Sequence, residues 1–198
     1  MWLNWIKSWN CVRNFFWRKI KKPVVLKISS PDLQHKTDIG GVILNLDNES
    51  EIKAGFNKLR DIGKTNSNKD NIEGIIVSEM VSHGVETVLG IVNDPVFGPT
   101  IMFGLGGVFV EVLEDVSFRI APFDVKEASS MIDEIRGRAI LNGVRGANPV
   151  DVKALAETLS QLSFFAVENA ENLSSVDLNP LIVLPHGAKI ADVLIRTK

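Results

Sequence analysis

Basic side chains in the N-terminal third of the chain have the types and spacing to bind phosphate. Lys27 interrupts an apolar strand predicted at 24–28, and a buried ammonium needs an anion or a route to solvent. The polar loop that follows carries His35 and Lys36, so two cations lie near one another in a pattern suited to a polyphosphate. A histidine with an ordinary pKa of about 6.5 can serve as a base, a metal ligand or a nucleophile. The alternative is an edge-strand lysine beside a surface histidine.

Two oxygen-bearing side chains near the C-terminus could hold a divalent metal. Asn179 precedes a proline at the end of the segment DLNP, and Asp192 lies on the next predicted strand. If these strands pair as a hairpin, the amide and the carboxylate can lie side by side. Oxygen ligands on a rigid frame suit Mg²⁺ in phosphoryl transfer. The alternative is an ordinary Asn/Asp pair at the end of a strand.

Carboxylates and an arginine elsewhere in the chain have weaker claims to a function. Glu79 and Glu86 flank a predicted turn at 82–84 and could accept hydrogen bonds from an adenine amine or from ribose hydroxyls. A solvated strand edge explains them equally simply. Glu111 and Arg119 follow a glycine cluster. They could reach phosphate or metal, or pair with each other.

Two groups of elements must position these side chains. The apolar patterns predict a small sheet with a helix, a hinge, and a larger mixed sheet with helices, so the fold class is α+β or α/β in two subdomains. The predicted strands are 24–28, 41–46, 74–81, 85–92, 100–103, 108–113, 176–184 and 189–195, and the predicted helices are 49–62, 125–135 and 149–170. We expect the strands 24–28 and 41–46 to form a hairpin, and 63–71 to be a polar loop.

Two glycine-containing segments resemble nucleotide-binding motifs without completing them. Gly63-Lys64-Thr65 matches the end of a P-loop, but Lys58 stands where that motif needs its first glycine. The cluster at 104–107 lacks the final glycine of a dinucleotide fingerprint. The sequence therefore argues against both a P-loop and a Rossmann domain.

Composition is ordinary for a soluble globular protein, except at the N-terminus. The chain has 198 residues, of which 45% are hydrophobic and 23% charged, and its net charge of -2 gives no case for nucleic-acid binding. Cys11 is the only cysteine, which fits a reducing, cytoplasmic compartment. Residues 1–22 form a basic leader that contains all four tryptophans. We interpret it as an atypical N-terminus, with an interfacial membrane helix as the disfavoured alternative.

Five segments, in order along the chain, together resemble the ATP-grasp domain of ADP-forming acyl-CoA synthetases, also called acetate–CoA ligases. The resemblance runs from about Pro23 to the end and extends to the layout of the succinyl-CoA synthetase β chain. It implies an ATP-grasp fold, with a small subdomain at 23–80, a large one at 81–198 and nucleotide between them. The matching segments are PVVLKISSPDLQHKTDIGGV (23–42), EGIIVSEMV (73–81), GVETVLGIVNDPVFGPTIMFGLGGVFVEVLEDVSFRIAP (84–122), LNGVRG (141–146) and DLNPL (177–181).

The resemblance also implies a role for each candidate residue. The net reaction of the family is acyl-CoA + ADP + phosphate ⇌ carboxylate + CoA + ATP, a ligase reaction that passes phosphate through phosphohistidines. His35 matches one phosphohistidine position, and the loop through it would cover the ATP phosphates. The implied nucleotide ligands are Lys27, Lys36, Glu79, Val81, Glu86 and Arg119, and the implied Mg²⁺ ligands are Asn179 and Asp192.

Two departures from the family limit these expectations. The chain lacks the family's CoA-binding α part, so we expect it to act with a separate α subunit in a hetero-oligomer. The leader 1–22 does not match the helix and strand that precede the lysine strand in the family, so we expect the small subdomain to lack N-terminal elements. The alternatives are a non-catalytic ATP-grasp sensing module and a truncated, inactive product.

Overall fold

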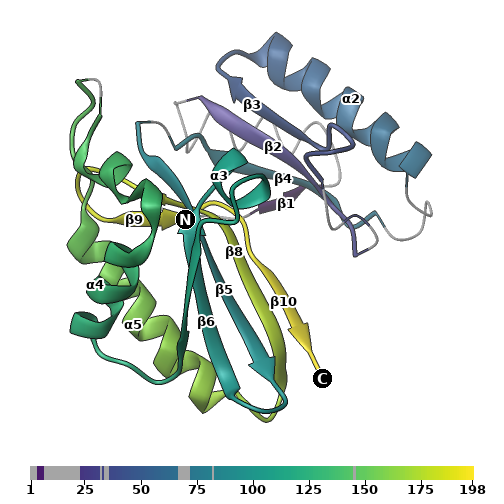
Figure 1. Cartoon of the computed structure of the whole chain (residues 1–198). Coiled ribbons are helices and arrows are strands. Elements are labelled where there is room, and N and C mark those ends of the chain that lie inside the picture. Colours follow the sequence, from purple (N-terminus) through teal and green to yellow (C-terminus); the bar gives the residue numbers. More distant parts are fainter. Residues whose placement is uncertain are drawn as a thin grey trace. The chain divides into compact units, whose positions relative to one another are not determined.

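The computed structural model describes residues 4–6, 23–31, 33, 36–66, 72–81, 83–144 and 146–198. The chain divides into two compact units, residues 1–80 and 81–198, and most of their elements are labelled in Figure 1. Unit 1 contains β1 (Asn4–Ile6), β2 (Val24–Ser29), β3 (Val42–Leu46), α2 (Glu49–Asn66) and β4 (Gly74–Glu79). Unit 2 contains β5 (Val85–Asp94), β6 (Gly98–Leu105), α3 (Val108–Glu111), β7 (Val116–Ile120), α4 (Val125–Glu134), η3 (Arg136–Asn142), α5 (Val152–Glu168), β8 (Leu173–Val183), β9 (Ala188–Ile190) and β10 (Leu194–Thr197).

In the described residues of unit 1, an antiparallel sheet carries helix α2 on one face. The strand order is β1-β4-β2-β3, and the expected hairpin of β2 with β3 is confirmed by the pairing of Lys27 with Val42. Helix α2 begins where Asn48 accepts a hydrogen bond from the backbone N–H of Glu51 at 3.0 Å, as an N-cap does. Its apolar stripe packs on the sheet, which buries the cluster Val24, Leu26, Ile28, Ile52, Phe56, Leu59, Ile75 and Val77 with Leu33 and Leu46.

Two expectations for unit 1 are wrong. The helix continues through Asn66, whereas the sequence predicted its end at Ile62. Gly63 is buried, and a Cβ there would lie 3.0 Å from Ile72 Cδ1. This close packing explains why a glycine lies inside the helix despite its low helix propensity. The leader also contributes an edge strand, because β1 pairs with β4. The small sheet therefore does not begin with the lysine strand.

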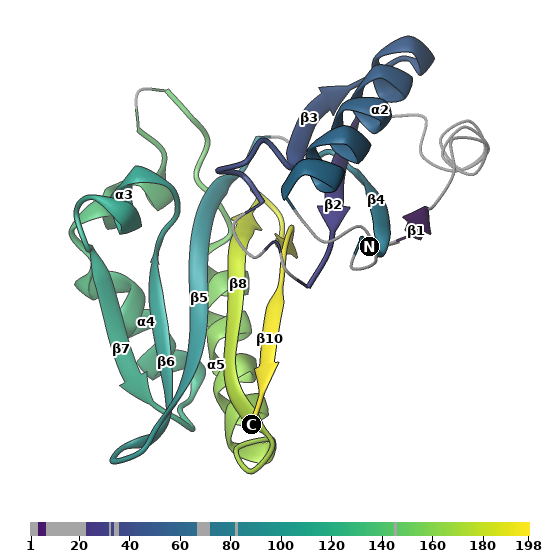
Figure 2. The ribbon, with the colours of Figure 1, turned by 90° about the vertical axis from the view of Figure 1, so that its right-hand side faces the viewer.

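Unit 2 is a larger antiparallel sheet with helices α4 and α5 on one face. Its strand order is β10-β8-β5-β6-β7, and β9 pairs with β8. All its recorded strand pairs are antiparallel, so the expectation of a mixed sheet is wrong. Figure 2 shows α5 behind the strands. The core includes Leu89, Ile91, Ile101, Phe103, Met131, Ile132, Leu155 and Leu159.

The segment after the glycine cluster differs from the prediction. Residues 108–113 were expected to be a strand, but Val108–Glu111 is the short helix α3. Gly107 has a φ of +63°, a conformation that interrupts an extended chain. Val110 N–H donates to the carbonyl of Gly107 at 3.1 Å. Glu111 therefore lies on a helical turn, and the expected strand is displaced to β7.

The C-terminal elements follow the prediction with shifted bounds. Helix α5 begins after Asp151, whose carboxylate accepts the Ala154 N–H at 3.0 Å, so Pro149 precedes the helix instead of occupying its first turn. The single strand expected at 189–195 is split into β9 and β10. None of the helices in the described ranges is long and apolar enough to cross a membrane.

Candidate functional site

Lys27 lies at the centre of the unit 1 sheet. Strand β2 pairs with β4 through Ile76 and with β3 through Val42 at this position, so the edge-strand alternative is excluded. The core residues on β2 are the alternate ones, Leu26 and Ile28, and side chains alternate along a strand. Lys27 therefore lies on the face opposite α2, where it is only 8% exposed. A charge held there requires compensation by an anion or hydrogen bonds.

The loop that contains Lys36 is closed by backbone hydrogen bonds. Gly41 N–H donates to the carbonyl of Lys36 at 2.7 Å, and Ile28 N–H donates to the carbonyl of Gly41 at 3.0 Å. A Cβ on Gly41 would lie 2.8 Å from the Lys36 carbonyl oxygen, so this position requires glycine. The loop thus ends against the strand of Lys27 and holds the Lys36 backbone near it. His35 lies outside the residues that the structure describes.

Glu79 and Val81 lie at the chain segment where unit 1 ends and unit 2 begins. Glu79 is the exposed last residue of β4, across from Val24. Met80 N–H donates to the carbonyl of Pro23 at 2.8 Å, which anchors the chain just beyond the strand. Val81 is partly buried.

Glu86 lies near the start of β5, across from Ile182 on β8. The alternate residues Val85 and Leu89 pack in or against the core covered by α4 and α5, so Glu86 lies on the opposite face of the sheet. Its side chain is exposed, and no hydrogen bond or ion pair to a described residue occupies its carboxylate. The carboxylate can therefore accept hydrogen bonds from a ligand.

Asn179 and Asp192 occupy opposing positions on neighbouring segments. Ile190 pairs with Leu181 and Leu194 pairs with Asp177, and this common register places Asp192 across from Asn179. Ala191 N–H donates to the Pro180 carbonyl at 2.9 Å, which fixes the two segments together at this point.

The strand of Asn179 is also locally irregular. Its register with β5 shifts between Thr87 and Leu89, so β8 carries an extra residue at the proline, as a bulge does. Opposed amide and carboxylate oxygens fit a hard cation such as Mg²⁺. Within the described ranges, no group of three or more His, Cys, Asp or Glu side chains could hold a metal by itself.

Arg119 is engaged by helix α4. Its Nε donates to Glu127 at 2.5 Å, and its two terminal nitrogens donate to the carboxylate of Glu134. The hydrogen bonds to Glu134 make the largest contribution to the raised pKa of Arg119, and the hydrogen bond to Glu127 makes the next largest. In turn, the guanidinium lowers the pKa of Glu134. Arg119 thus pairs with α4, on the helix-covered face. To bind a phosphate it would have to exchange these partners.

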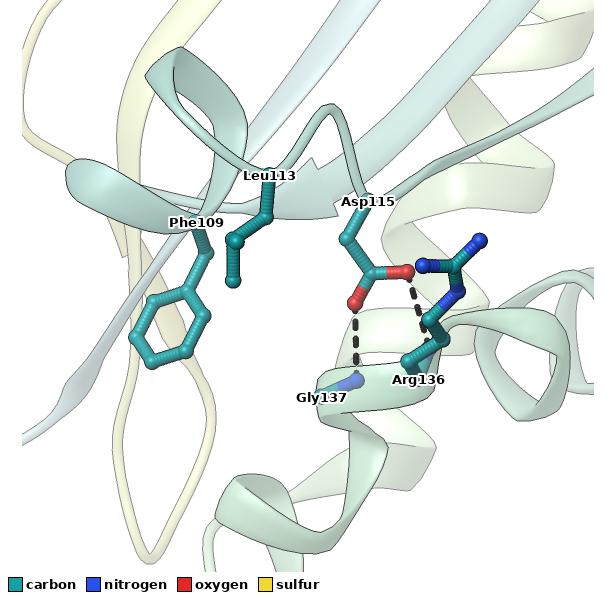
Figure 3. Close-up of a pocket in the computed structure, with 5 residues that line it drawn as sticks. All are labelled: Phe109, Leu113, Asp115, Arg136 and Gly137. Carbon is teal, nitrogen blue, oxygen red and sulfur yellow. Dashed lines mark hydrogen bonds between the residues drawn. The ribbon is translucent and has the colours of Figure 1, made fainter.

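A pocket of about 260 Å³ lies beside α3, lined by Phe109, Leu113, Asp115, Arg136 and Gly137 (Figure 3). Asp115 is buried, and its two oxygens accept the backbone N–H groups of Arg136 at 2.8 Å and Gly137 at 2.7 Å. In Figure 3 the Arg136 guanidinium extends away from Phe109 and Leu113. The carboxylate therefore has a structural role at the start of η3. Sequence reasoning missed it, because one aspartate before a strand gives no signal of a distant cap.

Comparison with known protein families gives a match over nearly the whole chain. The profile of the ATP-grasp domain family matches residues 15–197, so it begins inside the leader, eight residues before the resemblance noted at Pro23. The β subunit of acetate–CoA ligase [ADP-forming] I from Pyrococcus furiosus is 40% identical over 174 residues, which are 88% of this chain and 75% of that protein. Acetate–CoA ligase [ADP-forming] I from Archaeoglobus fulgidus is 46% identical over 86% of this chain.

The chain spans only about a quarter of some of these relatives. It covers 24% of the Archaeoglobus ligase and 26% of the 4-hydroxybutyrate–CoA ligase [ADP-forming] from Nitrosopumilus maritimus. Among solved structures it is similar to the dinucleotide-forming acetyl-coenzyme A synthetase 1 of Ca. Korarchaeum cryptofilum in complex with coenzyme A and Ca-AMPCP. That match has a TM-score of 0.94 and 44% identity, and it covers 99% of this chain and 85% of that one.

Proposed function

The chain belongs to the ATP-grasp domain family, and from this premise we propose that it is the nucleotide-binding subunit of an ADP-forming acyl-CoA ligase. The observation that carries the proposal is its 40% identity to a separately encoded β subunit, three quarters of which it covers. The proposed reaction is acyl-CoA + ADP + phosphate ⇌ carboxylate + CoA + ATP. The proposed partner is a CoA-binding subunit, because the Pyrococcus furiosus relative is named as one subunit of such a ligase.

In unit 1, the proposed phosphate ligands are Lys27 and Lys36. Burial on the central strand supports Lys27, because a lysine that is 8% exposed there has a restricted position. The backbone hydrogen bond from Gly41 supports Lys36, since it holds the Lys36 carbonyl beside the start of β3. His35 is proposed as the residue that accepts the phosphoryl group. Glu79 is a proposed acceptor for the adenosine group.

In unit 2, the proposed Mg²⁺ ligands are Asn179 and Asp192. Their opposed register supports this role, and the bound cation would neutralise phosphate charge during transfer. Glu86 and Val81 are proposed to bind the adenosine group, and the unoccupied carboxylate of Glu86 supports its part. Arg119 has the least support as a nucleotide ligand, because both of its carboxylate partners belong to α4.

The first test is nucleotide binding by the purified chain. Mg-ATP at 100 times its dissociation constant should stabilise the protein by about 2.7 kcal/mol. With Mg²⁺ as the divalent cation, Asp192→Asn should reduce this gain in stability. The absence of a thermal shift at millimolar nucleotide would favour an inactive product.

The second test is catalysis with a partner. The chain is mixed with a CoA-binding subunit of the same ligase family, acetyl-CoA, ADP, phosphate and Mg²⁺, and ATP formation is measured. His35→Ala should retain nucleotide binding and lose ATP formation. Nucleotide binding without turnover in the wild type would favour a sensing module, and unchanged turnover in His35→Ala would exclude the phosphohistidine role.

A further inference from the structure

Gly106 lies against the backbone of Glu86. The ladder between β5 and β6 has its last recorded pair at Thr87 and Leu105. One residue further, Gly106 N–H donates to the Glu86 carbonyl at 2.8 Å. This hydrogen bond extends the contact between the strands beyond the ladder and joins the glycine cluster to Glu86.

The space beside Glu86 accommodates only a glycine without adjustment. A Cβ built on Gly106 would lie 3.1 Å from the Cβ of Glu86 and 3.2 Å from both its carbonyl carbon and oxygen. These distances are shorter than ordinary contacts between carbon atoms. Glu86 cannot easily yield, because it pairs with Ile182 on β8 while Thr87 pairs with β6. The requirement for glycine at 106 therefore comes from close approach.

The direction of the Glu86 side chain is set by this backbone contact. Its carboxylate is exposed and has no hydrogen-bonding partner among the described residues, so none of their side chains orients it. The Glu86 backbone, from which this side chain starts, is held by its pairing with β8 on one side and by Gly106 on the other. A shift of a few tenths of an ångström at the Glu86 backbone would carry through to the carboxylate.

We propose that Gly106 is a positioning residue that holds Glu86 at the place where its carboxylate accepts hydrogen bonds from the nucleoside part of the bound nucleotide. The proposal rests on the function proposed above. It assigns a role to a glycine cluster that matches no phosphate-binding fingerprint. The cluster acts through Glu86, and it does not itself need to touch phosphate.

The test is a double-mutant cycle on Mg-ATP binding, measured by calorimetry with the full chain. Glu86→Ala should weaken binding about tenfold or more, since a hydrogen bond to a charged group is lost. Gly106→Ala should weaken it about threefold to tenfold in the wild type. In the Glu86→Ala background, the same change should alter the dissociation constant less than about twofold, because residues that act through one another are not additive.

The control is Gly90→Ala on β5, the strand that carries Glu86. A Cβ at Gly90 would lie 3.5 Å from Met102 Cε, an ordinary contact, so binding should stay within about twofold of the wild type. Thermal melting of each variant without nucleotide reports folding. If Gly106→Ala does not fold, Glu86→Asp decides the question, since it keeps the charge and retracts the carboxylate by one methylene group. It should weaken binding at least about threefold.

Analogues provide a readout that a purely structural role would not move. Dideoxy-ATP lacks the ribose hydroxyls and ITP lacks the adenine amine. Gly106→Ala should leave the affinity unchanged for one of these two analogues. That analogue is the one that lacks the group to which Glu86 hydrogen-bonds. Equal losses in both Glu86 backgrounds, or wild-type affinity in Gly106→Ala or Glu86→Asp, would overturn the inference and leave the proposed function intact. A wild-type chain that binds no Mg-ATP would overturn both.

Discussion

Replacing Arg119 with glutamine should destabilise unit 2 without weakening nucleotide binding. The guanidinium donates to Glu127 and Glu134 of α4 and its side chain is 22% exposed. Isolated surface ion pairs contribute about 0–1 kcal/mol, and bidentate, partly buried geometry increases this value. We therefore expect a loss of about 1–2 kcal/mol, which for a chain of this size lowers the melting temperature by about 3–6 °C.

Two measurements separate the structural role of Arg119 from a role in phosphate binding. Thermal melting without nucleotide should show the loss, and high salt should reduce it because the ion pairs are partly screened. Calorimetry with Mg-ATP should give a dissociation constant within about twofold of the wild type. Arg138→Gln is the matched control: Arg138 makes one exposed ion pair, with Asp133 at 2.7 Å, so its loss should stay below about 0.5 kcal/mol.

The opposite result would refute this reasoning. An unchanged melting temperature together with binding weakened about tenfold would mean that Arg119 exchanges its α4 partners for phosphate. Arg119 would then regain the role in nucleotide binding that the family resemblance implies.

Three further substitutions test the structural assignments. Asp115→Ala removes the acceptor of two backbone N–H groups and should lower the free energy of unfolding by about 2 kcal/mol, whereas Asp133→Ala, an exposed ion-pair control, should cost less than about 0.5 kcal/mol. Urea unfolding followed by far-UV circular dichroism measures both losses. Tryptophan fluorescence is unsuitable because all tryptophans lie in residues 1–22, outside unit 2. Backbone N–H groups hold the pKa of Asp151 below its usual range. Its contribution to stability should therefore be present above about pH 4 and disappear as the pH falls through the lowered pKa, and Asp151→Asn should flatten the acid limb of a plot of melting temperature against pH. Lys27→Met should weaken Mg-ATP binding about tenfold, as calorimetry would show; unchanged affinity would remove Lys27 from the phosphate ligands.

The sequence predicted the elements whose apolar periodicity agrees with their tertiary packing. The stripe on α2 and the face on α5 are both buried as expected. The β2–β3 hairpin was recognisable because a polar loop with two glycines separates two apolar runs. In these segments local propensity and burial favour the same structure, so a single sequence contains enough information.

Predictions were wrong where packing overrides local preference. The segment 108–113 is rich in Val and Phe, which favours a strand, yet the turn at Gly107 makes its first part a helix. The helix end expected at Gly63 is absent because that glycine packs against Ile72. The leader was interpreted as foreign to the fold, but Asn4–Ile6 pairs with β4. A strand of three residues has no periodicity to detect.

The sequence by itself determined which chemistry the chain can offer. Side-chain type and spacing identified Lys27 and Lys36 as cations near one loop, and Asn179 and Asp192 as candidate oxygen donors. The order of five motifs indicated the family, which the profile match over residues 15–197 confirms.

The positions of these groups follow from the tertiary fold. It places Lys27 on a central strand instead of an edge, Asp192 across from Asn179, and Arg119 against α4. It also shows that Gly106 contacts the backbone of Glu86. Strand order, register and the choice of sheet face arise from contacts between residues far apart in sequence, and local patterns do not encode these contacts.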